Sequence, residues 1–188
     1  TYICSDKTGT LTQNKMTVTA ACSASDEIPL TGEAAKKLFA LAALCCDAKH
    51  TGKGEVSGEP TEAAIVAAAE RSGTDTEKLR RKMPRTDEIP FSSERKMMSV
   101  AIKDGDKAIT VAKGAPDVLI KHCTDIILNG RKIPMTSALR EKILRLNSSL
   151  ADRALRVIAV AAGDTKNGKP DETGLAFCGL ISMEDPPR

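Results

Sequence analysis

The chain has 188 residues, of which 41% are hydrophobic and 28% are charged, so it can fold around a buried core and is not a disordered chain. Its 28 basic and 25 acidic residues leave a net charge of only +3, which argues against a nucleic-acid partner. Six cysteines occur without a Cys-x-x-Cys pair, alongside only two histidines. This spacing excludes a common zinc site and favours reduced, mostly buried thiols in a cytosolic protein.

The first half of the chain is expected to hold two short strands followed by helices. Apolar, β-prone runs predict the strands, and apolar residues spaced by three and four predict the first helix. Pro60 stands where a helix should begin, while Gly73 and Pro84 mark helix ends. The expected elements are strands at 1–5 and 16–23, helices at 31–49, 61–71 and 75–83, and a polar, glycine-rich loop at 50–58.

The second half is richer in strands. Asp104 and Gly105 lie between two alternating runs, which is the strongest hairpin signal in the chain, and Asn129 and Gly130 give a second one. Alternation predicts one apolar face on the first hairpin, made by Met98, Val100, Ile102, Ile109 and Val111. The expected elements are hairpins at 97–113 and 125–133, helices at 116–122 and 137–151, strands at 155–162 and 175–183, and a loop at 163–174.

This order of elements is mixed rather than a strict alternation of strands and helices. It predicts an α/β fold of the α+β type, with a mainly antiparallel sheet flanked by helices. No apolar run approaches the ~20 residues that span a bilayer, and no signal-peptide pattern opens the sequence, so the chain is expected to be soluble. Because both ends resemble strands, they are expected to belong to a different domain, into which the rest is inserted.

The motif at residues 6–12, Asp-Lys-Thr-Gly-Thr-Leu-Thr, follows the first apolar run. A strand and a tight glycine-containing turn can present a side chain where backbone N–H groups and hydroxyls converge on an anion. Asp6 is ionised at neutral pH, since the ordinary pKa of aspartate is ~3.9, so it needs no base to act as a nucleophile. Lys7, the hydroxyls of Thr8 and Thr10 and a metal ion would offset repulsion from an incoming phosphate. The structural alternative is an aspartate that caps a turn.

Continued by residues 13–18, this motif resembles the phosphorylation signature of P-type cation-transporting ATPases. The resemblance implies that Asp6 accepts the γ-phosphoryl group of ATP as an aspartyl-phosphate. It also implies that Lys7 and Thr8 are the catalytic neighbours of Asp6, and that Asp6 and the carbonyl of Thr8 bind Mg²⁺. ATP and Mg²⁺ are therefore the expected cofactors.

The resemblance spans essentially the whole chain and implies a domain organisation. Residues 15–183 would form the nucleotide-binding domain, while 1–14 and 184–188 would be fragments of a partial Rossmann-like phosphorylation domain and its hinge. The later catalytic segment, the actuator motif and the membrane helices of the family do not occur in these residues. We therefore expect a cytoplasmic part of an integral membrane protein. Its partners would be the remaining phosphorylation, actuator and transmembrane domains of the parent chain.

Three further stretches resemble the nucleotide-binding domain of the same family: residues 58–62, 91–100 and 113–117. Considered alone, Phe91 is either a core residue or a ring that stacks on adenine, an interaction worth ~1–3 kcal/mol for a base. A lone Lys113 is usually a surface charge. A carboxylate such as Glu62 in a first helical turn usually complements the helix dipole.

The resemblance assigns a ligand contact to each of these residues. It implies that Phe91, Lys96 and Lys113 surround the adenine ring, that Glu62 contacts the edge of the base, and that Arg156 reaches the phosphates. Gly114 has no side chain, which would let the backbone approach a flat ligand closely. The candidate nucleotide-binding residues are therefore Glu62, Phe91, Arg95, Lys96, Lys113, Gly114 and Arg156.

Two departures from the calcium-pump branch affect this assignment. Those relatives often carry arginine at the position of Ser93, so that phosphate contact is lost or passes to Arg95. Asp117 replaces a glutamate that is commoner in the family. The pattern is otherwise most similar to the calcium-pump branch, so Ca²⁺ is the expected ion by analogy alone.

Two other functions use some of the same residues. A haloacid-dehalogenase-like phosphatase shares the aspartate nucleophile, but it usually carries a second aspartate two residues later, where this chain has Thr8. A non-catalytic nucleotide-binding module would leave the motif around Asp6 unexplained. The basic cluster at residues 78–82 resembles an anion site but is more typical of a solvated helix face.

Overall fold

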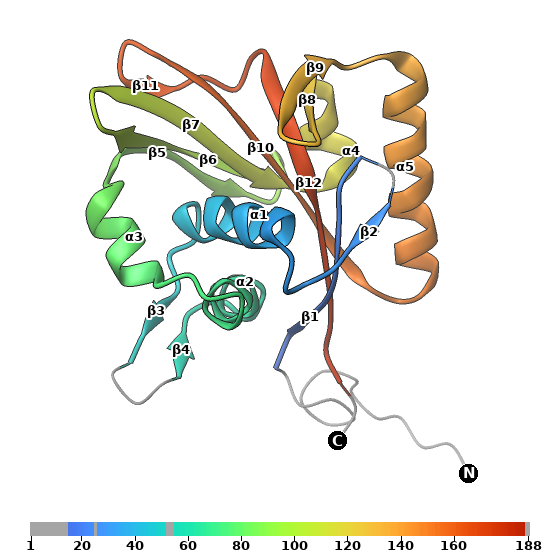
Figure 1. Ribbon diagram of the computed structural model, residues 1–188, viewed down its shortest axis with the longest axis horizontal. Coiled ribbons are helices and arrows are strands. Elements are labelled where there is room, and N and C mark those ends of the chain that lie inside the picture. Colours follow the sequence, from blue (N-terminus) through green and yellow to red (C-terminus); the bar gives the residue numbers. More distant parts are fainter. Residues whose placement is uncertain (1–14, 25, 52–54, 187–188) are drawn as a thin grey trace.

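Strands dominate the computed structural model, which describes residues 15–24, 26–51 and 55–186 (Figure 1). Ten strands in these residues join one sheet, and two more form a small hairpin. The strands of the sheet are β1 (Thr17–Cys22), β2 (Glu27–Ile28), β5 (Arg85–Ser92), β6 (Met97–Asp104), β7 (Lys107–Gly114), β8 (Cys123–Leu128), β9 (Arg131–Pro134), β10 (Arg156–Lys166), β11 (Lys169–Pro170) and β12 (Leu175–Glu184). The hairpin consists of β3 (Lys49–His50) and β4 (Val56–Ser57).

The main path of the sheet runs β2-β1-β12-β10-β7-β6-β5, and each neighbouring pair along it is antiparallel. β12 lies near the middle of this path. One side of β12 pairs with β10, while its other side pairs first with β8, in parallel, and then with β1. The sheet is therefore mainly antiparallel, as the sequence predicts.

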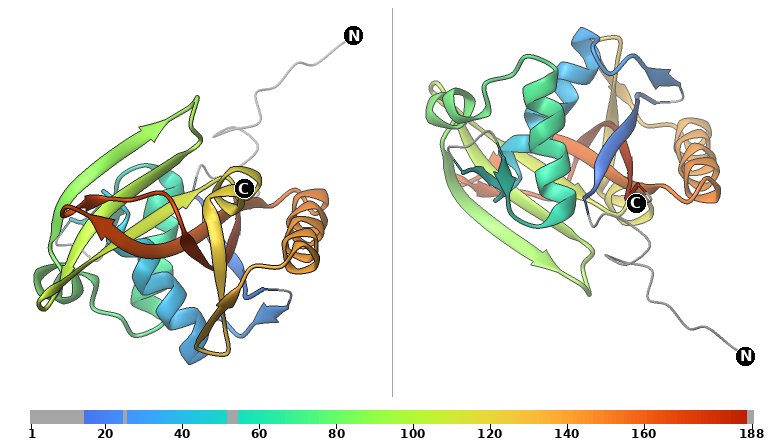
Figure 2. Two further views of the ribbon diagram at one scale, coloured as in Figure 1. Left: turned by 90° about the horizontal axis from the view of Figure 1, so that it is seen from above. Right: turned by 90° about the horizontal axis from the view of Figure 1, so that it is seen from below.

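Helices cover both faces of the sheet (Figures 1 and 2). One face, called the α1 face below, carries α1 (Glu33–Leu44), α2 (Pro60–Arg71) and α3 (Thr76–Lys82). The opposite face, called the α5 face, carries α4 (Pro116–Leu119), the short 3-10 turn η2 (Ile120–His122) and α5 (Ser137–Asp152). This arrangement confirms the expected α+β fold class, with a sheet flanked by helices.

Each face has its own hydrophobic core. Phe39 of α1 and Ile65 of α2 pack on Ile181 of β12 at the α1 face. Ile143 of α5 packs with Phe177 of β12 at the α5 face. A smaller cluster extends the α1 face toward the edge of the sheet and contains Leu44, Cys45, Met98, Val100, Ile102 and Val111.

Several predicted elements are confirmed. The β6–β7 hairpin turns where Asp104 and Gly105 predict it, and its register opposes Val100 and Val111. The predicted apolar face of this hairpin packs against the end of α1. Helices α2, α3 and α5 and the β8–β9 hairpin also lie within a few residues of their predicted positions. Local alternation and turn residues were sufficient signals for these elements.

Three predictions need correction. The first helix ends at Leu44 rather than near Lys49, and β3 and β4 form a hairpin within the segment that was expected to be a loop. β10 continues to Lys166 and β11 follows it, so the segment 163–174 is only partly loop. The sequence reasoning missed β5, because Pro90 and several charged residues obscure its alternation. Pro90 is tolerated there since β5 is an edge strand of the sheet.

The described chain enters and leaves the sheet at one place. Thr17 of β1 lies opposite Glu184 of β12, and the backbone N–H of Lys15 donates to Asp185 Oδ1 at 3.1 Å. This is the geometry that an inserted domain requires, because its two connections must meet. The predicted strand at 1–5 lies outside the described residues.

Five of the six cysteines fall within the described residues, and all five are free thiols, four of them buried. The expected burial is confirmed for four of these five cysteines. No group of three or more His, Cys, Asp and Glu side chains in the described part of the chain could hold a metal ion. Among those same residues, no helix is long and apolar enough to cross a membrane.

Candidate functional site: a strip of polar and aromatic side chains on the α1 face

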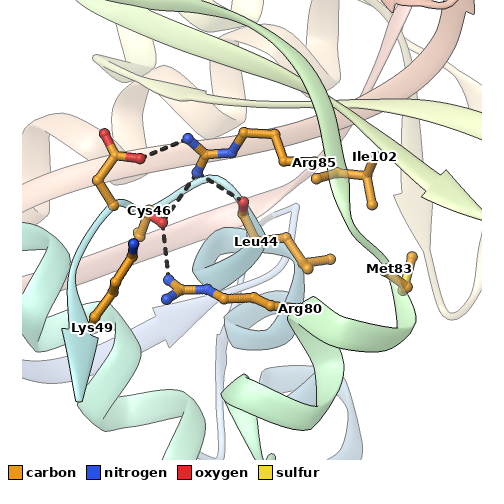
Figure 3. Close-up of a pocket in the computed structure, with 8 residues that line it drawn as sticks. Leu44, Cys46, Lys49, Arg80, Met83, Arg85 and Ile102 are labelled. Carbon is orange, nitrogen blue, oxygen red and sulfur yellow. Dashed lines mark hydrogen bonds and ion pairs between the residues drawn. The ribbon is translucent and has the colours of Figure 1, made fainter. Parts of the chain in front are cut away.

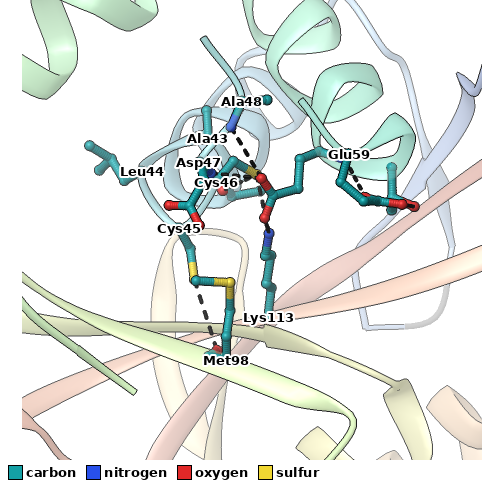
Figure 4. A network of polar contacts seen from close by, with 12 residues as sticks. Ala43, Leu44, Cys45, Cys46, Asp47, Ala48, Glu59, Met98 and Lys113 are labelled. Atoms are coloured by element: carbon teal, nitrogen blue, oxygen red, sulfur yellow. Dashed lines mark hydrogen bonds and ion pairs between the residues drawn. The ribbon is translucent and has the colours of Figure 1, made fainter. Parts of the chain in front are cut away.

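Lys113 lies near the end of β7, on the face of the sheet that carries α1 and α2. The register places it between Met98 of β6 and Val160 of β10. Its side chain is only 11% exposed, which is unusual for a lysine and requires a partner for the charge. That partner is Glu62, whose carboxylate forms an ion pair with the Lys113 ammonium group (Figure 4).

Glu62 occupies the first turn of α2, as predicted. The helix begins at Pro60, and the side chain of Glu59 accepts a hydrogen bond from the backbone N–H of Glu62. The Glu62 carboxylate also accepts hydrogen bonds from the backbone N–H groups of Asp47 and Ala48, at 2.7 and 3.1 Å. Glu62 therefore joins α2, β7 and the segment that follows α1, which dipole complementation alone would not do.

Two buried cysteine thiols, those of Cys45 and Cys46, also belong to this site. Cys46 Sγ lies 3.5 Å from Lys113 Nζ, and the Cys45 thiol donates to the carbonyl of Val111 at 3.6 Å. The Cys45 sulfur also lies 3.9 Å from the carbonyl oxygen of Met98, as Figure 4 shows. Burial raises the pKa of Cys46 to about 11 and that of Cys45 to about 12, so both thiols are neutral at physiological pH.

Lys113 stays charged in this setting. Burial alone would lower the pKa of its ammonium group, but its neighbours outweigh burial and raise the pKa above its ordinary value; at neutral pH, where both thiols are uncharged, the negative charge among these neighbours is that of Glu62. The α1 face therefore carries a buried positive charge, that of Lys113, at neutral pH.

Arg156, the first residue of β10, lies beside the start of α2. Its guanidinium group donates to Thr61 Oγ1 at 2.7 Å and lies 3.8 Å from the Glu59 carboxylate. Thr61 in turn donates to Glu59 at 2.8 Å. The Arg156 side chain remains 56% exposed, so its charge is held in place and is open to solvent.

Phe91 is the exposed large hydrophobic residue of the described chain, with 59% of its surface open to solvent. Along the β5–β6 ladder, Ile89 pairs with Ser99 and Ser92 pairs with Met97, so Pro90 and Phe91 together oppose the single residue Met98. This is a β-bulge, in which two residues of β5 oppose one residue of β6 and the ladder is locally interrupted. Phe91 therefore lies in the bulge opposite Met98, and Met98 pairs on its other side with Lys113.

Lys96 and Gly114 adjoin this strip. Lys96 is exposed and has a φ of 54° in the turn between β5 and β6, and its carbonyl accepts a hydrogen bond from the N–H of Ala115 at 2.9 Å. A Cβ atom at Gly114 would lie 2.5 Å from Met97 Cβ and 2.6 Å from the carbonyl oxygen of Lys96. The contact between β6 and β7 thus requires a glycine at this position, whatever its role toward a ligand.

Arg95 is not brought into the strip. Its guanidinium group forms an ion pair with Glu172 and donates to the carbonyl of Pro90 at 3.0 Å. Glu172 also accepts from Ser99 Oγ at 2.7 Å, and Ser99 pairs with Ala112, a residue of the α5-face core. The guanidinium group of Arg95 is therefore engaged with a residue on the opposite side of the sheet from Lys113.

The predicted catalytic residues Asp6, Lys7 and Thr8 lie outside the described residues, and so do the metal ligands predicted from the same motif. The candidate site in the structure is therefore the strip alone. It consists of Phe91, Lys96, Lys113, Glu62 and Arg156, with Thr61 and Glu59 beside it.

A separate cavity of about 260 Å³ opens between the end of α1, α3 and the start of β5 (Figure 3). Arg80 and Arg85 line it, but their guanidinium groups donate to backbone carbonyls at the end of α1, including that of Cys46 at 2.9 and 3.1 Å. The prediction of a solvated helix face at residues 78–82 is thus wrong for Arg80, although Arg81 is exposed. Both arginines are thus occupied by carbonyls at and just after the end of α1.

Sequence reasoning missed three neighbours of the candidate residues: Thr61, Cys46 and the backbone at 47–48. Pro60 at the start of a helix, just before Thr61, could have indicated Thr61. The other two follow from a contact between α1 and α2 that no local pattern reveals.

The fold and the strip define a class of protein that comparison with known families identifies. The family described as "P-type ATPase, cytoplasmic domain N" matches residues 34–188. The chain therefore belongs to this family, the N domains of P-type ATPases.

Individual relatives agree with this assignment. The chain is 42% identical to calcium-transporting ATPase 1 of Lactococcus lactis and 36% identical to a calcium-transporting ATPase of Listeria monocytogenes, in each case over 99% of this chain and 22% of the relative. It is also 34% identical, with the same shares covered, to the sodium/potassium-transporting ATPase subunit alpha-B of Artemia franciscana. The chain thus spans about a fifth of the length of these relatives. The part of these relatives that the chain matches therefore occurs both in relatives named for calcium and in one named for sodium and potassium.

Proposed function

We propose that the strip on the α1 face binds ATP. The observation that carries this proposal is the exposed ring of Phe91 in the bulge opposite Met98, the cross-strand neighbour of the buried, charged Lys113. An aromatic ring in water beside a cation is suited to a flat, electron-rich base, which gains stacking on the ring and a favourable charge contact.

The other residues of the strip would complete the contacts. Lys96 is exposed five residues after Phe91 and would flank the base, while a Glu62 oxygen would accept from the amino group of the base. Arg156, which is fixed by Thr61 and yet 56% exposed, would bind the phosphates. Arg95 is a poorer candidate for the phosphate contact, because it is paired with Glu172.

In the parent protein, this domain would serve ATP-driven cation transport through a cytoplasmic part of a membrane protein. Asp6 would accept the γ-phosphoryl group, with Lys7 and Thr8 beside it, and Mg²⁺ at Asp6 and Thr8 would offset the negative charge. Residues 15–183 would move as one nucleotide-binding domain on connections at 1–14 and 184–188. The names of the bacterial relatives favour Ca²⁺ as the ion. The remaining phosphorylation, actuator and transmembrane domains would be its partners.

Titration of ATP into the 188-residue chain, followed by NMR of the backbone amides, tests the binding proposal. We expect shifts around Phe91, Lys113 and the start of α2, and we expect Phe91→Ala to weaken binding about tenfold, as loss of base stacking does. A wild-type chain that does not respond to ATP, or an unchanged affinity in Phe91→Ala, would contradict the proposal.

The phosphate contact has a matched control. Arg156→Gln and Arg153→Gln remove the same group from two arginines that are equally exposed, at 56%, and three residues apart. Only Arg156→Gln should weaken ATP binding, and it should affect adenosine binding little. Equal effects of the two substitutions would show that bulk charge, rather than a specific contact, explains them.

The role of Asp6 is tested in the full-length protein. The proposal predicts a phosphorylated intermediate that hydroxylamine cleaves and that Asp6→Asn abolishes. Phosphatase turnover by the 188-residue chain would instead favour the haloacid-dehalogenase-like alternative, and absence of the intermediate would favour a non-catalytic module. The family match favours neither alternative.

A further inference from the structure

The bulge that carries Phe91 is weakly held by its own sheet. Between the pairs Ile89–Ser99 and Ser92–Met97, the ladder has no paired position for Pro90 or Phe91. Proline also has no N–H group to donate. Since β5 is an edge strand, no further strand lies beyond it in the described sheet to secure this segment. The orientation of Phe91 must therefore depend on contacts other than the β5–β6 ladder.

Arg95 supplies such a contact. One guanidinium nitrogen donates to the carbonyl of Pro90, the residue directly before Phe91, at 3.0 Å. The backbone N–H of Arg95 donates to Ser92 Oγ at 3.2 Å, directly after Phe91. Arg95 thus contacts the chain on both sides of Phe91, through its backbone N–H after Phe91 and through its guanidinium group before it. The planar guanidinium group has a second partner, which fixes its direction.

The second partner of this guanidinium group is Glu172, 77 residues later in the chain. Glu172 belongs to the segment between β11 and β12, and its side chain is 18% exposed. Its carboxylate also accepts from Ser99 Oγ at 2.7 Å. An ionised hydrogen bond that is largely shielded from water is stronger than an exposed ion pair.

The Glu172 segment is itself anchored. The carbonyl of Glu172 lies 2.9 Å from His122 Nδ1, and the N–H of Asp171 donates to Thr110 Oγ1 at 2.9 Å. Asp171 also accepts from the N–H and hydroxyl of Thr173, at 2.9 and 2.7 Å. The backbone that carries the Glu172 side chain is therefore held in place, so the Glu172 carboxylate can orient Arg95.

We propose that Glu172 and Arg95 form a positioning pair for the adenine site: anchored on the α5 face, Glu172 orients Arg95, and Arg95 sets the bulge that presents the Phe91 ring. The inference rests on the proposed function for its consequence, which is affinity for an adenine nucleotide. It changes the role of Arg95 from a phosphate contact to a positioning residue, and it gives Glu172 a role in the nucleotide site.

The first test needs no ligand. The chain contains three phenylalanines, Phe39, Phe91 and Phe177, so a fluorophenylalanine-labelled protein gives three ¹⁹F resonances. Phe91→Leu identifies the resonance of Phe91. We expect Glu172→Gln, and separately Arg95→Lys, to shift or broaden the Phe91 resonance. Phe39, which is 1% exposed on the α1 face, should keep its resonance.

A matched control removes the same charge elsewhere. Glu141→Gln disrupts the exposed pair of Glu141 with Arg145 on α5 and should leave all three resonances unchanged. An unchanged Phe91 resonance in both Glu172→Gln and Arg95→Lys would overturn the proposal. A shift of Phe39 together with Phe91 would also overturn it, because that result would indicate general loosening of the fold.

The second test is a double-mutant cycle on ATP affinity. Glu172→Gln should weaken ATP binding about fivefold in the wild-type background and less than about twofold in the Phe91→Ala background, because coupled residues are not additive. The loss should be the same for adenosine as for ATP. Equal losses in both backgrounds, or a loss confined to ATP, would overturn the proposal and return Arg95 to the phosphates.

These outcomes separate the two hypotheses. If the unsubstituted chain does not bind ATP, the proposed function fails, whatever the ¹⁹F spectra show. If it binds ATP and Glu172→Gln leaves both the affinity and the Phe91 resonance unchanged, the positioning role fails while the proposed function stands.

Discussion

Glu62 and Lys113 form an ion pair in which the two side chains are only 13% and 11% exposed, and this pair joins α2 to β7. The partners are not equivalent. Glu62 keeps two hydrogen bonds from the backbone N–H groups of Asp47 and Ala48, whereas the other polar neighbour of the Lys113 ammonium group is the Cys46 thiol. The pair is therefore a structural contact as well as part of the candidate site.

This asymmetry predicts unequal costs of substitution. Glu62→Met leaves a buried ammonium ion with no carboxylate partner and should lower the free energy of unfolding by about 3 kcal/mol. Lys113→Met leaves a carboxylate that still accepts from Asp47 and Ala48, so it should cost about 1 kcal/mol. Urea unfolding measures both values. Lys37→Met, in the exposed pair with Glu33, is the control and should change little. A larger cost for Lys113→Met than for Glu62→Met would contradict this interpretation.

Arg80 should be far less replaceable than its neighbour Arg81. The two terminal guanidinium nitrogens of Arg80 donate to the carbonyl of Ala43, in the last turn of α1, and to those of Cys46 and Ala48, which follow the helix. Lysine cannot reproduce this geometry, so Arg80→Lys should lower the unfolding free energy by about 1–2 kcal/mol. Arg81→Lys, at an exposed position, should change it by less than about 0.5 kcal/mol. Thermal unfolding of the two variants, compared side by side, would reveal equal stabilities if Arg80 were only a surface charge.

Gly114 should tolerate alanine less well than Gly105 does. A Cβ at Gly114 meets Met97 Cβ and the Lys96 carbonyl oxygen, both fixed to the backbone of β6, so Gly114→Ala should cost about 2 kcal/mol. Gly105 has a φ of +61° but nothing within 4 Å of its Cβ position, so Gly105→Ala should cost only about 1 kcal/mol. Chemical denaturation distinguishes the two, and equal costs would show that β6 can move away from β7.

The buried thiols should resist alkylation in the folded chain. Burial raises the pKa of Cys46 to about 11 and of Cys123 to about 12, so at pH 8 only about one Cys46 thiol in a thousand is the reactive thiolate. Because these folded-state pKa values lie above the ordinary value, the thiolate fraction stays low until the pH approaches 11. Iodoacetamide labelling followed by mass spectrometry should modify Cys22, Cys45, Cys46, Cys123 and Cys178 rapidly in urea and slowly without it. Rapid labelling of Cys45 or Cys46 in the folded chain would contradict this prediction, because it would show that these buried thiols become accessible to solvent.

Much of the fold could be predicted because the residues that determine an element lie within or next to that element in the sequence. Asp104 and Gly105 fix the β6–β7 hairpin, and alternation along it places Val100 and Val111 on one face. Pro60 marks the start of α2 and so fixes where Glu62 lies. The family resemblance rested on short motifs of this kind, and the match over residues 34–188 confirms it.

The remainder depends on partners far apart in the sequence. The end of α1 was placed too late, because its last turn is set by Glu62, Arg80 and Arg85, which lie on other elements. Arg95 was considered as a substitute phosphate contact because Ser93 stands where relatives often carry arginine. Its partner Glu172 lies 77 residues away, and no periodicity or spacing connects them.

The juxtaposition of Thr17 and Glu184 has a mechanical consequence. Because β1 and β12 are antiparallel and their described outer ends lie together, a force that separates those ends acts across the ladder rather than along it. It would load one hydrogen-bonded pair at a time, beginning with Thr17 and Glu184 and moving toward Cys22 and Leu180. The two strands would therefore peel apart at low force, while the core between α1 and β10 would remain intact until later.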